Sequence, residues 1–393
     1  MSARTGAANA DFARREAASS GEHADRAFVA SLVDPVSGAE LHADTPHSLS
    51  DGTTRWPVLE GIPYLRAGRD EVREPALAAL DEGRERDAAA VLLADNDDWW
   101  DQPPPPAEQL RAVLDATTLR EAVAGLGLGR VGDYFLHRDH DPSGLAVLAL
   151  TAAHPPAGRP VLDLACGAGH LLRRLAQHGE GDLTGVDVVF GKLWLARRFV
   201  VPRHVALVCA DLAHPWPLPP RTDTYVAVHD VLYFLDDPAA VLTTATQHAG
   251  ERGAVVAAHC HNTGRPGHPR PPEAWAALLP GALTYGDEEL TSATLERRLP
   301  RSADAQDLGD TEAVALARDG GAAAPEPALL DPAPGADLRP NPLYVDGARH
   351  WPNEVWGAEY GPRAATYLPE RRPDPLPDDA VARRLLVDLP ESW

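Results

Sequence analysis

Residues 161–170 read VLDLACGAGH, and this stretch decides the fold. Residues 160–164 form a short apolar run around one acid, which is typical of a strand buried inside a sheet. A glycine turn follows at residues 166–169, and residues 170–178 have their leucines on one helical face. The sequence therefore predicts a strand, a tight turn and a helix whose N-terminus points back over the turn.

The same alternation continues along the chain. Short apolar runs predict further strands at residues 183–187, 205–211, 224–228 and 254–258, with helices at 190–199 and 238–249. Strands that alternate with helices at this spacing predict an α/β fold with a parallel, doubly wound sheet. Ligands of such sheets bind outside the carboxyl ends of the strands.

Acidic residues stand at or near the carboxyl ends of three predicted strands, namely Asp163, Asp187 and Asp211. We expect all three to face one crevice. Asp187, eighteen residues after Gly169, can accept two hydrogen bonds from a ribose diol. Asp211, with the backbone on either side of it, can recognise the edge of an adenine.

The glycine turn distinguishes two classes of cofactor. A dinucleotide-binding turn needs a third glycine, and Leu172 occupies that position here. The stretch instead resembles motif I of class I S-adenosylmethionine-dependent methyltransferases, in which an acid precedes the turn. The resemblance continues in order through residues 185–187 (GVD), 209–211 (CAD) and 229–235 (HDVLYFL). It implies a Rossmann-like sheet with helices on both faces, methyltransferase activity and S-adenosylmethionine as cofactor.

The resemblance also implies roles for single residues. Asp163 would orient the glycine loop, Asp187 would bind the ribose hydroxyls and Asp211 the adenine amino group. Residues 132–141 would cap the cofactor, with Arg138 beside the methionine carboxylate; the alternative is a surface helix with satisfied charges. The expected cofactor-binding residues are Tyr134, Arg138, Asp163, Ala165, Gly167, Gly169, Asp187, Val188, Asp211, Leu212 and His229.

Three catalytic candidates, His229, Asp230 and His261, follow the fourth and fifth predicted strands. His229 could act as a general base toward a hydroxyl acceptor, because the pKa of histidine lies near neutrality; the alternative is a structural histidine at a strand end. His259 and His261 would point to one face, which admits a metal site. No third ligand is evident in the sequence, so we expect no metal and an acceptor-lining role. Tyr233 is expected either to wall the sulfonium or to belong to the core.

The chain divides into five segments by composition and pattern. Residues 71–94 and 107–126 have helical spacing and are separated by the prolines of residues 103–106. The expected segments are a flexible tail (1–26), a small β-rich module (27–68), a helical cap (69–128), the cofactor-binding domain (129–320) and a Pro- and Trp-rich C-terminal extension (321–393) that forms a lid or a dimer contact.

The β-rich module has a resemblance of its own. Residues 32–41 and 56–65 resemble the small zinc-ribbon activator family of methyltransferase partners. Asp34 stands where that family has its first cysteine, and residues 1–165 contain no cysteine. The resemblance therefore implies a degenerate, metal-free ribbon that supports the catalytic domain or shapes one wall of the acceptor site.

The C-terminal extension contains one motif, Asn341-Pro342-Leu343-Tyr344. It is similar to the Asn-Pro-Pro-Tyr motif of amino-methylating enzymes. That motif must follow the fourth strand directly to reach a methyl group, a position that His229 and Asp230 hold here. We therefore expect a structural role for Asn341.

Charge and composition limit the kinds of partner that the chain can bind. The net charge of −22 argues against nucleic acid, whose binding depends on lysines and arginines that neutralise phosphates. No apolar run reaches the ~20 residues of a membrane span, and the N-terminus lacks the pattern of a signal peptide. Cys166, Cys209 and Cys260 form no disulfide or zinc pattern, so a reducing cytoplasm is expected.

These observations favour methyl transfer to a small-molecule acceptor, as in specialised metabolism. An RNA- or ribosome-directed methyltransferase is the second reading, because the zinc-ribbon relatives serve translation. A non-catalytic subunit that binds the cofactor or a partner enzyme is the third. The sequence leaves open the acceptor, the atom methylated and whether the chain forms a homodimer.

Overall fold

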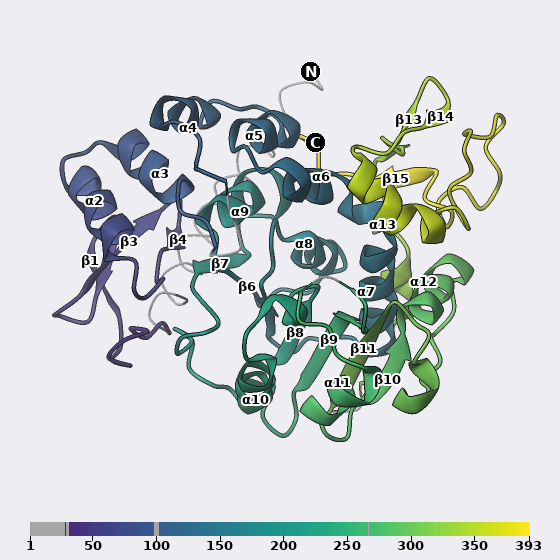
Figure 1. Ribbon diagram of the computed structural model, residues 1–393. Coiled ribbons are helices and arrows are strands. Elements are labelled where there is room, and N and C mark those ends of the chain that lie inside the picture. The colour runs from purple at the N-terminus through teal and green to yellow at the C-terminus, as the bar shows by residue number, and fades with distance from the viewer. Residues whose placement is uncertain (1–27, 29–30, 98–101, 266, 322) are drawn as a thin grey trace, which may run out of the picture.

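A seven-stranded sheet forms the centre of the molecule in the computed structural model, which describes residues 28, 31–97, 102–265, 267–321 and 323–393 (Figure 1). The expected tail, residues 1–26, lies outside these ranges. The strand order is β10-β11-β9-β8-β5-β6-β7, and the predicted α/β class is confirmed. The strands are β5 (Val161–Leu164), β6 (Leu183–Asp187), β7 (Ala206–Cys209), β8 (Tyr225–His229), β9 (Ala254–His261), β10 (Leu283–Gly286) and β11 (Ala313–Asp319).

The strand order creates a switch point beside β5. This strand pairs in parallel with β6 on one side and β8 on the other, so Asp163 lies in register between Gly185 and Ala227. The chain runs outward to β7 and then crosses back to β8. The carboxyl ends of these strands therefore meet at one edge, where ligands bind in such folds. The antiparallel pair β10 and β11 extends the sheet beyond β9.

Helices bury both faces of the sheet, which explains why its strands read as continuous apolar runs. Val161 and Tyr225 pack toward α7 (Pro142–Ala153), α8 (His170–Gln177) and α9 (Phe190–Leu195). The alternating residues Leu162 and Val226 pack toward α10 (Pro238–Ala249) and α11 (Pro272–Leu278). Within the described ranges, no helix is both long enough and apolar enough to cross a membrane.

The helical cap is more broken than the sequence predicts. Residues 71–94 form two helices, α2 (Asp70–Asp81) and α3 (Glu85–Leu93), because Gly83 adopts a left-handed φ of 72° between them. Residues 107–126 also form two helices, α4 (Ala107–Val113) and α5 (Leu119–Gly125). A new helix starts there because Thr118 and Glu121 form a capping box.

The N-terminal module is a four-stranded antiparallel sheet of β1 (His42–Thr45), β2 (Ser48–Ser50), β3 (Arg55–Leu59) and β4 (Ile62–Pro63). Asp34 is buried at its entrance. One carboxylate oxygen accepts the backbone N–H groups of Val36 and Ser37, at 2.7 and 2.9 Å. The other accepts the indole N–H of Trp56 at 2.7 Å. A carboxylate thus organises the turn at the position where the resembling family has its first cysteine.

The module is joined to the edge of the central sheet. Tyr64, just after β4, forms a parallel bridge with Cys209 of β7. The backbone N–H of Leu65 donates to the Cys209 carbonyl at 2.7 Å. The module therefore lies along the open side of β7, next to the carboxyl ends of the parallel strands (Figure 1).

The C-terminal extension packs over α7 on the opposite side (Figure 1). Trp356 and Tyr360 of α13 (Glu354–Ala364) share a buried cluster with Leu145 of α7. Two small pairings, β12 (Leu338–Pro340) with β15 (Leu386–Asp388) and β13 (Tyr344–Val345) with β14 (Ala348–Arg349), complete the extension. The Asn341 side chain is used internally: it accepts from the Leu343 N–H and donates to a backbone carbonyl, as a structural role requires.

Candidate functional site

The glycine loop after β5 has an unusual backbone. Ala165, Gly167 and Gly169 adopt left-handed φ values of 54°, 56° and 80°. A Cβ added to Gly169 would lie 2.6 Å from a methyl carbon of Val201, so only glycine fits without a shift. Gly169 caps α8, which places the free N–H groups of this helix beside the loop. The loop is therefore built for close approach by a ligand.

Asp187, at the end of β6, holds this loop. One carboxylate oxygen accepts the Gly167 N–H and the other accepts the Val189 N–H, both at 2.9 Å. The Lys192 ammonium lies 3.7 Å from the same carboxylate. Each carboxylate oxygen keeps a further lone pair for a ligand hydroxyl. Asp187 can therefore orient the loop and bind a diol at once.

Asp163, the last acid within β5, is buried beneath the loop. Burial and, to a smaller extent, the neighbouring Asp187 carboxylate raise the pKa of its carboxyl to about 8, against the opposing effect of Arg138. Binding of a cationic ligand beside this carboxyl is therefore favourable, because a nearby positive charge stabilises its ionised form.

The predicted adenine-binding residues continue the same edge. The Ala210 N–H donates to the Asp187 carbonyl at 3.0 Å, which places the start of the next loop beside β6. Asp211 follows and accepts the Ala213 N–H at 2.9 Å. Val188 and Leu212, which directly follow Asp187 and Asp211, are both half-buried. The structure thus brings the expected ribose and adenine residues to neighbouring positions.

A second group of predicted residues meets at Asp230, directly after β8. Asp230 has a left-handed φ of 59°. Its carboxylate accepts the Tyr134 hydroxyl at 2.9 Å and the Tyr233 hydroxyl at 2.5 Å. Burial opposes ionisation of Asp230, but His259 and Arg138 outweigh it and lower its pKa to about 2. Tyr233 is therefore a partner of this carboxylate and not merely part of the core.

Arg138 is anchored by protein groups. Its guanidinium hydrogen-bonds to Asp141 at 3.1 Å and to the Ser143 hydroxyl, and it lies 3.6 Å from Asp230. It also stacks over the Tyr134 ring at 4.7 Å. The alternative interpretation, a surface helix with satisfied charges, holds for the charges, but Arg138 is buried at the site.

His229 is not arranged as the general base that the sequence suggested. Its Nδ1 accepts the Ala258 backbone N–H at 3.1 Å, so the proton of the neutral ring resides on Nε2. Burial lowers the pKa of His229 to about 3. Its Nε2 has no hydrogen-bond partner among the described residues. This ring is suited to donating a hydrogen bond and not to accepting a proton.

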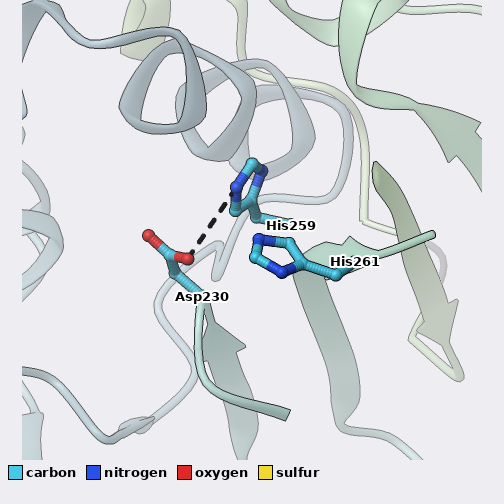
Figure 2. A group of neighbouring side chains, drawn as sticks. All are labelled: Asp230, His259 and His261. Atoms are coloured by element: carbon cyan, nitrogen blue, oxygen red, sulfur yellow. Dashed lines mark ion pairs between the residues drawn. The ribbon is translucent and has the colours of Figure 1, made fainter. Parts of the chain in front are cut away.

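His259 and His261 lie beside Asp230, as Figure 2 shows. His259 Nδ1 is 2.6 Å from the buried Asp287 carboxylate, and its Nε2 is 3.9 Å from Asp230. Burial disfavours the charged ring, but these two carboxylates raise the pKa of His259 above its usual value. His261 stacks on Tyr233, with ring centroids 3.4 Å apart.

The sequence interpretation missed two residues of this second group, Asp287 and Arg363. It named His259 with His261 as a pair that admits a metal site, but it did not include His259 among the expected site residues. Asp287 opens α12 (Asp287–Glu296), and Arg363 reaches it from α13 at 3.4 Å. An acid at the first position of a helix is common, so the sequence carries no signal that would have singled out Asp287.

One family model matches part of the chain. Residues 161–253, less than half of the chain, match a family model described as a methyltransferase domain. The matched segment contains the glycine loop and the strand ends that carry Asp187, Asp211 and Asp230. No curated protein sequence matches the chain.

Several solved structures resemble parts of the chain. An S-adenosylmethionine-dependent methyltransferase from Mesorhizobium loti is 26% identical over 29% of this chain and 52% of its own, with a TM-score of 0.26. One from Thermotoga maritima is 15% identical over 49% and 95%, with a TM-score of 0.35. Phosphoethanolamine N-methyltransferase 2 from Haemonchus contortus is 14% identical over 52% and 60%, with a TM-score of 0.36. The chain thus spans only about half the length of the Mesorhizobium protein.

Proposed function

We propose that this protein is an S-adenosylmethionine-dependent methyltransferase that acts on a small-molecule acceptor. One observation carries the proposal. The segment that matches the methyltransferase family is the same segment that supplies the left-handed glycine loop and the acids at the strand ends. S-adenosylmethionine is the cofactor that this family match supports, and the residues of the crevice fit it.

The fit rests on complementary groups. The loop offers backbone approach at Gly167 and Gly169, and Asp187 offers carboxylate lone pairs for the ribose diol. Asp163 is a buried carboxyl whose pKa is raised by burial and by Asp187, so a cationic group beside it would stabilise its ionised form. The cofactor would supply an electrophilic methyl group on a sulfonium, and the task of the protein is to position that group and exclude water.

The second group of residues forms the acceptor end. His229 would donate a hydrogen bond from Nε2 at the boundary between cofactor and acceptor. Asp230, fixed by Tyr134 and Tyr233, and the neighbouring His261 would position the acceptor. All these side chains come from strand ends or from α6 (Gly129–His137) and a short 3-10 helix, which are rigid supports for in-line geometry.

A small acceptor is favoured over RNA. Tyr360 of α13 is 4% exposed and interacts electrostatically with Asp230, so this helix packs against the acceptor end and favours a small acceptor there. The site is also rich in carboxylates, and the whole chain carries a net charge of −22. Both features oppose binding of a phosphate backbone.

Calorimetry with S-adenosylhomocysteine tests cofactor binding first. Transfer is then tested with methyl-labelled S-adenosylmethionine and a heat-treated cell extract separated into RNA and low-molecular-weight fractions. We expect stoichiometric binding and label in the low-molecular-weight fraction. Label in RNA would establish an RNA-directed methyltransferase instead, and binding without transfer to any fraction would favour a non-catalytic subunit. No binding would refute the cofactor assignment itself.

A further inference from the structure

We infer that Asp230, His259 and His261 form a binding site for one divalent transition-metal ion. Each side chain offers one ligand atom, and these atoms lie within 4.8 Å of one another (Figure 2). Two imidazoles and one carboxylate suit ions such as Zn²⁺, Mn²⁺ or Fe²⁺ better than Mg²⁺, which prefers oxygen ligands. The sequence showed no third ligand for the histidine pair, because Asp230 comes from a different strand.

The backbone at this site is shaped for the cluster. Asp230 and His259 both adopt left-handed φ values, 59° and 56°, although neither is glycine. The pairing of β9 with β11 shifts register between Val314 and Leu316, opposite His259. This bulge turns the His259 ring toward β8. Left-handed non-glycine residues persist where the surroundings impose them, and they concentrate at functional sites.

The contact of His259 with Asp287 is the outer contact expected of a metal-binding histidine. The carboxylate holds Nδ1 at 2.6 Å, which leaves Nε2 directed toward Asp230. His259 is 1% exposed, and its Nε2 has no hydrogen-bond partner among the described residues. Metal-bound histidines nearly always donate their other ring N–H to a carboxylate or carbonyl in this way.

Asp230 can bind an ion while it keeps its present partners. Tyr233 and Tyr134 each donate to a different carboxylate oxygen. Each oxygen has a second lone pair that remains available. The tyrosines would therefore orient the ligand as Asp287 orients His259.

The net charge of the residues around this cluster also favours a bound cation. Among the described residues, six carboxylates of this region face three guanidinium groups, so neutral histidines leave the region negatively charged. The carboxylates belong to Asp141, Asp230, Asp287, Glu288, Glu312 and Glu359, and the guanidinium groups to Arg138, Arg265 and Arg363. A divalent ion reduces this excess. The most distant ligand atoms, up to 4.8 Å apart, need to approach by about 1.4 Å, because tetrahedral coordination at ~2.1 Å places ligand atoms ~3.4 Å apart.

Three protein ligands leave coordination positions open. If the proposed methyltransferase function holds, an acceptor with a hydroxyl or carboxylate oxygen could occupy one of them and be oriented toward the methyl group. Only this last step rests on the proposed function. The metal site itself is tested without any activity measurement.

The experiment uses full-length, tag-free protein dialysed against a chelator and then against metal-free buffer. Titration with ZnCl₂ or MnCl₂ in a calorimeter should show one equivalent of ion per chain, with MgCl₂ giving no comparable binding. Addition of CoCl₂ should produce absorption bands typical of nitrogen and oxygen ligands. His261→Gln and Asp230→Asn should each weaken Zn²⁺ binding more than tenfold, and Asp287→Asn by about 10- to 100-fold.

A matched control is His248→Gln, because His248 of α10 is also a buried histidine and packs against Trp216, away from the cluster. It should bind Zn²⁺ like the parent. Circular dichroism and S-adenosylhomocysteine titration report whether each variant is folded. The inference is overturned if the parent binds no stoichiometric ion. In that case the positive charge between Asp230 and Asp287 would be a proton on His259. It is also overturned if Zn²⁺ binding survives both His261→Gln and Asp230→Asn. Normal S-adenosylhomocysteine binding without Zn²⁺ binding would refute the metal site and leave the proposed function intact.

Discussion

The carboxylate of Asp187 accepts the backbone N–H of Gly167 at 2.9 Å, and this bond connects the end of β6 to the loop after β5. The group expected to bind the ribose therefore also sets the conformation of the loop expected to surround the methionine. The two halves of the cofactor site are coupled through one side chain.

Asp187→Asn tests this coupling. The amide has only one acceptor oxygen, so it cannot receive both the Gly167 and the Val189 N–H groups. The ribose diol would also lose its charged acceptor, and a hydrogen bond to a charged group contributes about 1.5–3 kcal/mol, which corresponds to a drop of roughly 10- to 150-fold in affinity. We expect this loss in a calorimetric titration with S-adenosylhomocysteine.

Asp182→Asn is the matched control, because Asp182 lies just before the same strand in an exposed ion pair with Arg221. It should bind the ligand like the parent. An unchanged affinity in Asp187→Asn would place the ribose elsewhere.

Asp163 predicts that cofactor binding releases a proton. Its carboxyl is largely protonated at pH 7, because burial raises the pKa to about 8 from an ordinary value of 3.8. A bound cation lowers this pKa, so affinity should rise with pH up to about 8 and then level off. At pH 7, the heat of S-adenosylmethionine binding should differ between two buffers of different ionisation enthalpy.

Asp163→Asn should remove most of this buffer dependence, and what remains belongs to the amino group of the cofactor. Equal heats for the parent in both buffers would contradict the prediction. The same raised pKa means that the folded, ligand-free protein loses stability as the pH rises from about 4 to about 8, and the variant should lose less.

Asp34→Ala should destabilise the N-terminal module. The substitution leaves the buried indole N–H of Trp56 without its acceptor and also removes the acceptor of two backbone N–H groups. An unsatisfied buried donor costs about 1–3 kcal/mol. We expect a lower midpoint in thermal unfolding followed by tryptophan fluorescence.

The comparison for this variant is Asp51→Ala, because Asp51 accepts two backbone N–H groups in an exposed turn of the same module. Its unfolding midpoint should stay close to that of the parent. Equal midpoints for both variants would mean that Asp34 does not organise the module.

Asp388→Ala should loosen the C-terminal extension. Asp388 accepts from the Arg173 guanidinium and from the Gln177 amide, both at 2.9 Å, and the Arg173 pair is buried. Removing one partner of a buried ion pair costs about 3–5 kcal/mol, because the other charge remains. Limited proteolysis should cleave the extension faster than in the parent.

Asp379→Ala removes a carboxylate of the same extension that pairs with Arg383 at the surface. Exposed pairs contribute little, so its cleavage rate should match that of the parent. Equal rates for Asp388→Ala and Asp379→Ala would show that the Arg173 contact does not hold the extension in place.

The local pattern of apolar and polar residues was sufficient to predict the elements of the parallel half of the sheet. β6 and α10 begin and end at the predicted residues, and β5 is one residue shorter than its apolar run. Each of these elements is amphipathic or mostly apolar over its own length, and a proline or an acid marks its boundary. The acids at the strand ends follow from the same pattern, because parallel strands place their carboxyl ends at one edge.

The antiparallel half was not predictable in this way. The position of β11 between β9 and β10 depends on pairing between segments far apart in the chain. The bulge that turns His259 toward Asp230 depends on that pairing, and so do the contacts of Asp287 and Arg363. A short window of sequence holds no information about a register shift in a partner strand.

The bridge between Tyr64 and Cys209 has a consequence for handling the protein. β7 ends the sheet, and a bare terminal strand presents unpaired N–H and C=O groups that recruit other chains. The small module, which is part of the same chain, covers the carboxyl end of this margin at fixed one-to-one stoichiometry. A fragment trimmed to residues 129–393 would leave it bare, so we expect that fragment to aggregate more readily than the full chain, although it retains every residue of the proposed cofactor crevice.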